Sequence, residues 1–302
     1  MTHRRAVLLM IVVTLLWSIA GVVTRHLDAA RSFEVTFWRS LFNAIALAVA
    51  LSAMRGAGLW RQIATGSKAL WISGLCWSVM YTAFMVAITL TTVANVLITM
   101  AIGPLITALF ARIFLHHHLP PRTWIAIAVG GAGIAWMFAG DAGGQGASLG
   151  GTLIALAVPL AAAINWTVLQ HISHGAGDPD ADAPQEDMLP AVLIGAVISA
   201  AVTLPLAWPL QATAHDLGLL GMLGVVQLAI PCLIVVRLTR ELPGPEIALL
   251  GLLEVVFGTL WAWIGAGERP ADTALTGGAL VLGALVANEA LALTTRTTRR
   301  LA

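Results

Sequence analysis

Two glutamates stand in a stretch of the chain that is otherwise apolar. Residues 251–270 read GLLEVVFGTLWAWIGAGERP, with Glu254 inside the apolar run and Glu268 where the run stops. A carboxylate inside a membrane-spanning helix is costly, so such a group seldom faces lipid. We expect Glu254 either to bind a substrate amino group or a coupling proton, or to be buried against Arg39 or a backbone donor. Glu268 is expected to mark the outer end of the span and to be structural.

Helical spacing places Glu254 on one stripe of its helix. The other members of this stripe are Glu246, Leu250, Gly258 and Trp261. The corresponding stripe of an earlier apolar segment carries Asn95, Thr99, Gly103 and Thr107. Two helices that present polar and small residues in this way are typical of the walls of a central, partly hydrated cavity. We therefore expect Asn95 and Thr99 to contact a bound solute.

A second group of candidate binding residues combines aromatic rings with amides in the middle of apolar segments. Trp77 and Tyr81 are four residues apart and share a helix face, and Tyr81 is the only tyrosine of the chain. The other members are Trp17, Asn165, Trp166 and Gln227. This set favours a pocket for an amphipathic or aromatic solute, whereas the alternative for part of it is helix packing.

Arg39 is the only basic residue deep in an apolar segment, ~9 Å from its outer end at the helical rise per residue. One interpretation is that its guanidinium binds a substrate carboxylate through two parallel hydrogen bonds. The other is that the side chain extends toward the surface or pairs with a carboxylate such as Glu34. We favour the structural interpretation, with Arg39 in an ion pair.

Other chemistry is disfavoured by the arrangement of the reactive residues. The histidines at 116–118 are consecutive, so their rings point around a helix end instead of converging on a metal ion. Cys76 and Cys232 both lie in apolar runs, where free thiols usually pack. Residues 141–151 are glycine-rich, but no predicted strand precedes them and no Lys-Ser/Thr pair follows, which disfavours a phosphate loop. We predict no catalytic residue, no metal and no cofactor.

The composition indicates that lipid is the solvent for most of the surface. Of the 302 residues, 59% are hydrophobic and 10% are charged, whereas about a quarter of the residues of a soluble domain are charged. The net charge of +1 gives no reason to expect a nucleic acid partner. A helix of about 20 apolar residues crosses a bilayer. Ten segments meet this requirement: 6–24, 33–54, 69–90, 94–115, 122–139, 150–170, 188–208, 217–236, 245–265 and 274–293.

The distribution of arginine and lysine predicts the orientation of these spans. With the N-terminus in the cytoplasm, twelve of the 16 basic residues lie on the cytoplasmic side, and only Arg25, Arg31 and Arg269 lie on the other. We therefore expect a multi-pass protein of the plasma (inner) membrane with both termini in the cytoplasm. The basic N-terminal segment is expected to be retained as the first span, because no convincing cleavage site follows it.

The two halves of the chain align without a gap near their ends. The aligned pairs include Asn95 with Glu246, Gly103 with Glu254, and His117 with Glu268. Each half has five predicted spans, so the second half enters the membrane from the opposite side, as in the inverted repeats of many secondary transporters. The predicted units are a first repeat over 1–140, a Gly-rich linker over 141–149 and a second repeat over 150–302.

These features resemble the drug/metabolite transporter superfamily and its EamA-type repeats, over nearly the whole chain. The motifs are Trp17, the run Phe37-Trp38-Arg39, Gly103-Pro104, Leu253-Glu254-Val255 and Gly267-Glu268-Arg269. The histidines at 116–118 stand where the superfamily usually has Gly-Glu. The resemblance implies an all-α integral membrane protein with ten transmembrane helices as two inverted five-helix repeats. Within the superfamily, the chain resembles the aromatic amino acid exporters.

The sequence therefore predicts a secondary transporter or facilitator that exports small organic metabolites by alternating access around a central cavity. The resemblance implies amino acids, and the tryptophans favour large neutral or aromatic ones. The alternative is proton-coupled efflux of cationic drugs, which requires a deep carboxylate such as Glu254. An intramembrane enzyme is disfavoured, because the mid-span residues offer no convergent nucleophile, base or metal cluster. A structural or assembly protein would show no flux across the membrane.

The expected partners are a small-molecule solute and the lipid bilayer. Glycines recur in the predicted spans 122–139 and 274–293, and small residues allow helices to approach closely. These two spans are therefore expected to pack against another helix or another subunit. The expected oligomeric state is a monomer or a weak homodimer.

Overall fold

The computed structural model describes residues 1–90, 93–116, 119–137, 148–175, 187–266 and 272–301, which form helices joined by turns and loops, with no strand among them. In chain order the helices are α1 (His3–Ser18), α2 (Ala20–Thr24), α3 (Ser32–Arg55), α4 (Gly58–Thr65), α5 (Lys68–Leu90), α6 (Val93–Met100), α7 (Gly103–Phe114), α8 (Pro121–Met137), α9 (Leu149–Gly175), α10 (Pro190–Ala207), α11 (Ala214–Met222), η1 (Leu223–Ala229), α12 (Ile230–Leu238), α13 (Gly244–Gly251), α14 (Leu253–Ala266) and α15 (Asp272–Leu301). The all-helical class predicted from the sequence is confirmed for these residues.

Seven of the ten predicted spans have a counterpart that is long and apolar enough to cross a membrane. These segments are His3–Thr24, Phe33–Arg55, Lys68–Ala87, Leu149–Ile172, Pro190–Ala207, Ala214–Leu238 and Gly244–Gly265. The predicted span 122–139 corresponds to α8, which has only 17 described residues. The predicted span 274–293 falls within α15, whose apolar part is Leu275–Asn288. The chain is thus a multi-pass helical membrane protein.

The predicted span 94–115 consists of two helices, which corrects the expectation of one continuous helix. The first, α6, ends at Met100, and the second, α7, begins at Gly103. Pro104 explains the interruption, because proline has no N–H to donate and its ring clashes with the carbonyl four residues earlier, here that of Met100. The apolar periodicity continues through the break, so it carries no signal of it.

Three other predicted spans are also interrupted. In residues 6–24, a turn at Ile19 separates α1 from α2. Residues 245–265 divide into α13 and α14, and the N–H groups of Leu252 and Val255 bond to carbonyls three residues earlier, which tightens the turn between them. Residues 217–236 contain η1, a stretch of π-helix that precedes Pro231. Pro231 offers no N–H to the carbonyl of Gln227, so the regular α-helical ladder is lost at this point.

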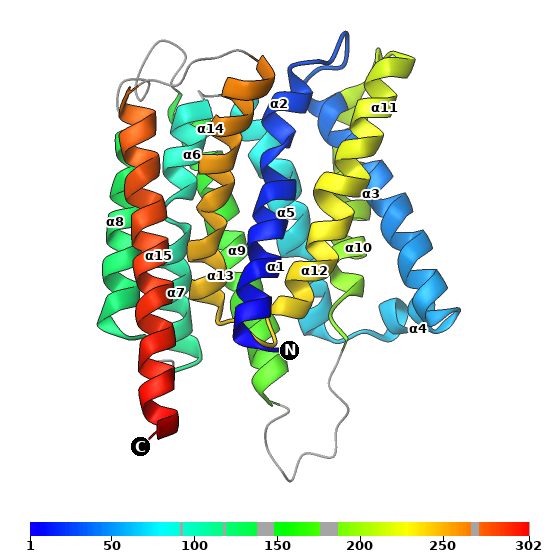
Figure 1. Cartoon of the computed structure of the whole chain (residues 1–302). Helices are drawn as coiled ribbons and strands as arrows, with labels where there is room; N and C mark the ends of the chain where they lie inside the picture. Colours follow the sequence, from blue (N-terminus) through cyan, green and yellow to red (C-terminus); the bar gives the residue numbers. More distant parts are fainter. Residues whose placement is uncertain (91–92, 117–118, 138–147, 176–186, 267–271, 302) are drawn as a thin grey trace.

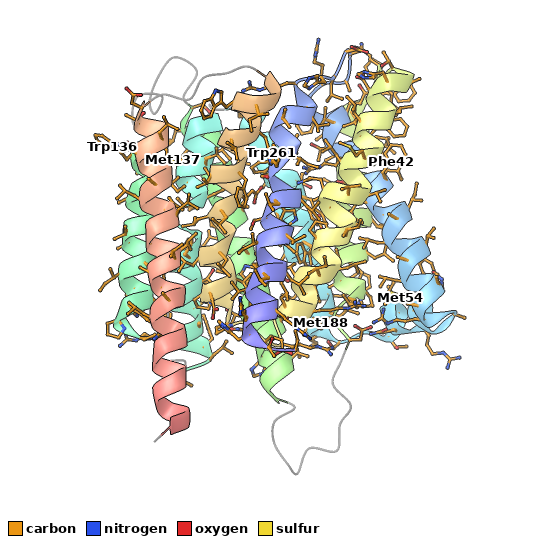
Figure 2. The ribbon with its side chains drawn as sticks, viewed as in Figure 1. Phe42, Met54, Trp136, Met137, Met188 and Trp261 are labelled. Atoms are coloured by element: carbon orange, nitrogen blue, oxygen red, sulfur yellow. The ribbon has the colours of Figure 1, made fainter. Side chains whose placement is uncertain are left out.

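The helices stand side by side in one bundle, with the described ends of the chain at the same end of it (Figure 1). The most extensive pairings join α5 to α9, α3 to α10, α5 to α10 and α8 to α15. In addition, α1 packs against α12 and α14, and α7 packs against α9 and α13. Large apolar side chains such as Trp136 project outward from the bundle (Figure 2), as expected of a surface in contact with lipid.

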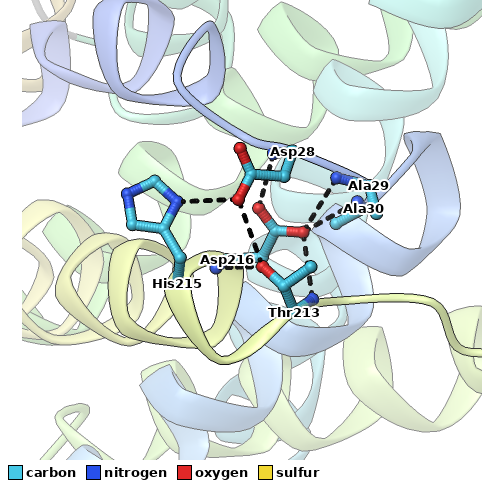
Figure 3. A network of polar contacts seen from close by, with 6 residues as sticks. All are labelled: Asp28, Ala29, Ala30, Thr213, His215 and Asp216. Carbon is cyan, nitrogen blue, oxygen red and sulfur yellow. Dashed lines mark hydrogen bonds and ion pairs between the residues drawn. The ribbon is translucent and has the colours of Figure 1, made fainter.

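A buried carboxylate fastens the loop between α2 and α3 to the start of α11 (Figure 3). The carboxylate oxygens of Asp216 accept hydrogen bonds of 2.7–3.1 Å from four backbone N–H groups, those of Asp28, Ala29, Ala30 and Thr213. The Thr213 hydroxyl accepts from the N–H of Asp216, which completes a capping box at the helix N-terminus. Nearby, His215 lies 3.2 Å from a carboxylate oxygen of Asp28. Since both oxygens of Asp216 accept bonds from the backbone, the geometry assigns this cluster to loop structure.

Gly224 lies where η1 crosses α3 at close range. A Cβ atom added there would lie 2.6 Å from the Cβ of Phe42 and 2.8 Å from backbone atoms of Arg39 and Asn43. We expect Gly224→Ala to lower the free energy of unfolding by about 1–3 kcal/mol, because the two helices have to separate. Gly218→Ala is the control, since no atom lies within 4 Å of its added Cβ. Thermal unfolding in detergent, followed by circular dichroism, measures both, and equal midpoints would contradict the prediction.

Candidate functional site

A cavity of about 190 Å³ lies in the middle of the bundle, between helices of both halves of the chain. Its walls come from α1, α3, α5, α6, α7, α9, η1, α12, α13 and α14. Six of the nine residues predicted to bind solute line it, namely Trp17, Trp77, Tyr81, Trp166, Gln227 and Glu254. Arg39, predicted to be structural, lines it as well. The breaks after α6 and α13 also border this cavity, at Ala101 and Leu252.

Aromatic rings form one wall of the cavity. The ring centroids of Trp77 and Trp166 lie 5.7 Å apart in an edge-to-face arrangement, and those of Trp77 and Tyr81 also lie 5.7 Å apart. The Tyr81 hydroxyl donates to the sulfur of Cys232 at 3.3 Å. This bond commits the hydroxyl to a helix contact, so the ring is the part of Tyr81 best placed to meet a solute. Such a wall suits an apolar or aromatic side chain.

A cation and a carboxylate border the same cavity. Arg39 is 3% exposed and donates from Nη2 to the backbone carbonyl of Tyr81 at 3.2 Å. Its Nε has no hydrogen-bond partner among the described residues, although it is buried. Glu254 lies in the first turn of α14, where a helix N-terminus favours negative charge. The break before α14 therefore explains how a carboxylate is accommodated at this depth.

The expected ion pairs of Arg39 are not found. Within the described part of the chain, Arg39 has no carboxylate oxygen within 4.0 Å, so it pairs with neither Glu254 nor Glu34. Instead, a carboxylate oxygen of Glu34 accepts from the indole N–H of Trp38 and from two backbone N–H groups, those of Gln211 and Ala212. Arg39 and Glu254 thus both border the central cavity without forming an ion pair with each other.

Further polar atoms around the cavity also lack partners. Gln227 donates from Nε2 to the carbonyl of Trp17 at 3.1 Å, and its Oε1 has no hydrogen-bond partner among the described residues. The same holds for the indole N–H of Trp77 and the hydroxyl of Thr107. Buried polar groups in native proteins are nearly always hydrogen-bonded, to protein or to ordered water. The cavity therefore offers both donors and acceptors to a polar solute or to water.

Two of the predicted binding residues, Asn165 and Thr99, do not contribute to the cavity walls. Asn165 is fully buried and accepts a 2.6 Å hydrogen bond from the hydroxyl of Ser73, so its side chain joins α9 to α5. Thr99 is buried away from the cavity walls. The side chain of Asn95 lies outside the described residues, and so does Glu268, for which a structural role was predicted.

Several cavity residues were not singled out from the sequence. Met10, Met80, Met100 and Phe84 line the walls, and so does Cys232, which had been assigned to packing. Nothing in their types or spacing separates them from the other apolar residues of the same helices. Their exposure to the cavity follows from the rotation of each helix in the bundle.

The fold and the cavity together define a class, that of multi-pass helical membrane proteins with a central site shared by several helices. Residues 4–139 match the model of the EamA-like transporter family. The resemblance to EamA-type drug/metabolite transporters predicted from the sequence is thereby confirmed for this part of the chain. By its name, the family is one of transporters.

The fold is shared with proteins of known structure. A crystal structure titled only as that of a protein is 20% identical to this chain, with a TM-score of 0.75. The match covers 95% of this chain and 99% of that chain, so the two have the same fold over nearly their whole lengths. No curated protein matches the chain in sequence.

Proposed function

We propose that the chain is a ten-span secondary transporter built from two inverted five-helix repeats. The helix breaks in the two halves support this proposal, because they recur at one spacing. Met100 ends α6 and Gly251 ends α13, 151 residues later. The sequence alignment of Asn95 with Glu246 has the same offset.

The packing pattern also agrees with an inverted repeat. Such a repeat relates the first span to the sixth, the second to the seventh, and so on around a two-fold axis in the membrane plane. This relation pairs α3, the second span, with α10, the seventh, and α8, the fifth, with α15, the tenth. The contacts of α3 with α10 and of α8 with α15 are therefore each their own counterpart. The contact of α5 with α9 maps onto that of α12 with α1, which is also present. A cavity on such an axis is where transporters of this plan bind solutes.

The proposed activity is export of small organic metabolites by alternating access, with large neutral or aromatic amino acids as the solutes. The observation that carries it is the shared cavity, in which a guanidinium, a carboxylate and an aromatic wall meet. An amino acid has a carboxylate for Arg39 and an ammonium group for Glu254. Trp77 and Trp166 supply a surface for its side chain.

Counterflow in proteoliposomes tests this function. We expect vesicles loaded with unlabelled tryptophan, phenylalanine or leucine to accumulate the labelled amino acid faster than empty vesicles and faster than vesicles loaded with glutamate. The physical reason is that the described lining of the cavity has one cation, one anion and an aromatic wall, and so offers no second cation to an acidic side chain. Exchange of none of the neutral amino acids above the empty-vesicle background would contradict the proposal.

The second candidate is proton-coupled efflux of cationic drugs. Glu254 favours it, because a carboxylate on a central cavity binds either an organic cation or a proton. Arg39 on the same cavity weighs against it, since a second positive charge there is repelled. Uptake of a labelled cationic dye into vesicles, with and without an imposed pH gradient, separates the two candidates.

A further inference from the structure

A second hollow, of about 300 Å³, lies at the end of the bundle where the N-terminus is placed. Its walls come from the ends of α3, α9 and α12, from residues 187–189 before α10, and from the turn after α12. It is separate from the central cavity, and the two have no lining residue in common. The amino acid proposal does not use it.

Three arginines from two different regions of the chain border this hollow. Arg55 closes α3, and Arg237 and Arg240 are three residues apart at the end of α12. A helix C-terminus attracts cations, which accounts for Arg55 and Arg237, each in the last turn of its own helix. It does not account for Arg240, beyond the end of α12, or for the gathering of all three guanidinium groups around one space.

The two carboxylates of the hollow already have partners. Asp187 forms an ion pair with Nη2 of Arg55, and Glu241 accepts from the terminal amine of Met1 at 2.8 Å. Arg237 and Arg240 are exposed and form no ion pair within the described part of the chain. Among the described residues that line the hollow, the basic side chains therefore outnumber the carboxylates, and those without an ion pair belong to α12 and the turn that follows it.

Arg55 supplies the observation that points to a ligand. While its Nη2 contacts Asp187, its Nη1 is buried and has no hydrogen-bond partner among the described residues. A buried guanidinium nitrogen is costly to leave without an acceptor. An anionic oxygen in the hollow would satisfy it, and a guanidinium fork matches phosphate oxygens in geometry.

We propose that this hollow binds a phosphate group, carried either by an anionic phospholipid or by free phosphate. Arg55, Arg237 and Arg240 provide the donors, and Leu169 and Ile172 provide an apolar wall beside them. Basic pockets between helix ends are typical sites for anionic headgroups on the cytoplasmic side of membrane proteins. The basic-residue asymmetry of the chain assigns this end of the bundle to that side.

Titration calorimetry on the full chain in detergent tests the proposal with three probes: dihexanoylphosphatidylglycerol, dihexanoylphosphatidylcholine and inorganic phosphate. We expect saturable binding of phosphatidylglycerol, and affinity for phosphatidylcholine at least about tenfold weaker because its choline cancels the charge. The variant R237A/R240A is expected to bind phosphatidylglycerol about 10- to 30-fold more weakly than the parent chain. Arg55 is left in place, because its removal would leave Asp187 unpaired.

The matched control is R61A/R112A, which removes two exposed arginines that do not border the hollow. We expect it to change the affinity less than about twofold. Binding of phosphatidylglycerol without measurable binding of phosphate would assign the site to lipid, and comparable binding of both would assign it to the phosphate group alone. The proposal is overturned if R237A/R240A binds both anions as tightly as the parent chain. It is also overturned if phosphatidylcholine binds as tightly as phosphatidylglycerol, or if neither anion binds.

Discussion

Replacing Glu254 by glutamine is expected to lower the initial rate of amino acid exchange in proteoliposomes by about 10- to 100-fold. Glutamine keeps the shape of the side chain and removes its charge. A hydrogen bond to a charged group contributes about 1.5–3 kcal/mol, which corresponds to that range. Since Glu254 borders the central cavity in the first turn of α14, the loss is expected in binding of the solute ammonium group.

Glu241→Gln is the matched control for this substitution. It removes a carboxylate at the end of the bundle, outside the central cavity, and is expected to change the exchange rate less than about twofold. Size-exclusion profiles and tryptophan emission establish that both variants fold. Unchanged exchange in Glu254→Gln would sink the assignment of Glu254 to substrate binding.

The same variant discriminates between amine recognition and proton transport. A variant that exchanges amino acids normally and no longer responds to an imposed pH gradient would assign a coupling proton to Glu254. A variant that loses exchange with and without the gradient would assign it to substrate recognition. These outcomes differ because exchange moves one solute molecule inward for each one that moves outward, and this requires no net movement of a coupling proton.

The residues that line the cavity were predictable where both the residue type and its position in the middle of an apolar segment indicate a binding role. Trp17, Trp77, Tyr81 and Trp166 are bulky or amphipathic residues in the middle of apolar runs, and all four face the same space. Arg39 shows the limit of this reasoning. Its depth was evident from the sequence. Whether its guanidinium pairs with a carboxylate depends on where the other helices place their carboxylates.

Asn165 shows a second limit, because the sequence does not determine how each helix is rotated about its axis in the bundle. Consecutive residues of an α-helix are turned by about 100° from each other. Asn165 and Trp166 therefore point in different directions, and the chain directs Trp166 inward while Asn165 contacts Ser73 on α5. The sequence marks both residues as deep and polar or aromatic, whereas the packing of α9 against α5 decides which one faces the site.

The helix breaks were predictable only in part. Pro104 and Pro231 identify two of them by their missing N–H groups. The break between α13 and α14 has no proline, and Gly251 is its only local signal. Its position matches that of the first-half break at an offset of 151 residues, so the duplication is a better guide to it than local propensity.

Trp166→Ala is expected to raise the KM for tryptophan exchange by at least about tenfold while raising that for alanine much less. The indole of Trp166 is 5% exposed, packs edge-to-face on Trp77 and borders the cavity. Loss of an aromatic contact and of buried apolar surface together accounts for about 1.5–4 kcal/mol, and only a solute with a large ring meets that surface. A residue that merely packs would lower the amount of folded protein and affect both solutes equally.

Trp71→Ala is the matched control, because Trp71 lies on α5 and is 45% exposed on the outside of the bundle. Trp166→Phe covers the case in which the alanine variant does not fold, since truncating a buried tryptophan costs about 3–5 kcal/mol of stability. The phenylalanine variant keeps a ring in place and is expected to raise the KM for tryptophan by a smaller factor, with the KM for alanine again raised less. The prediction is contradicted if the Trp166 variants change the KM for tryptophan and the KM for alanine by the same factor, as Trp71→Ala is expected to do. Selection by the aromatic wall requires that the KM for the larger solute rise more.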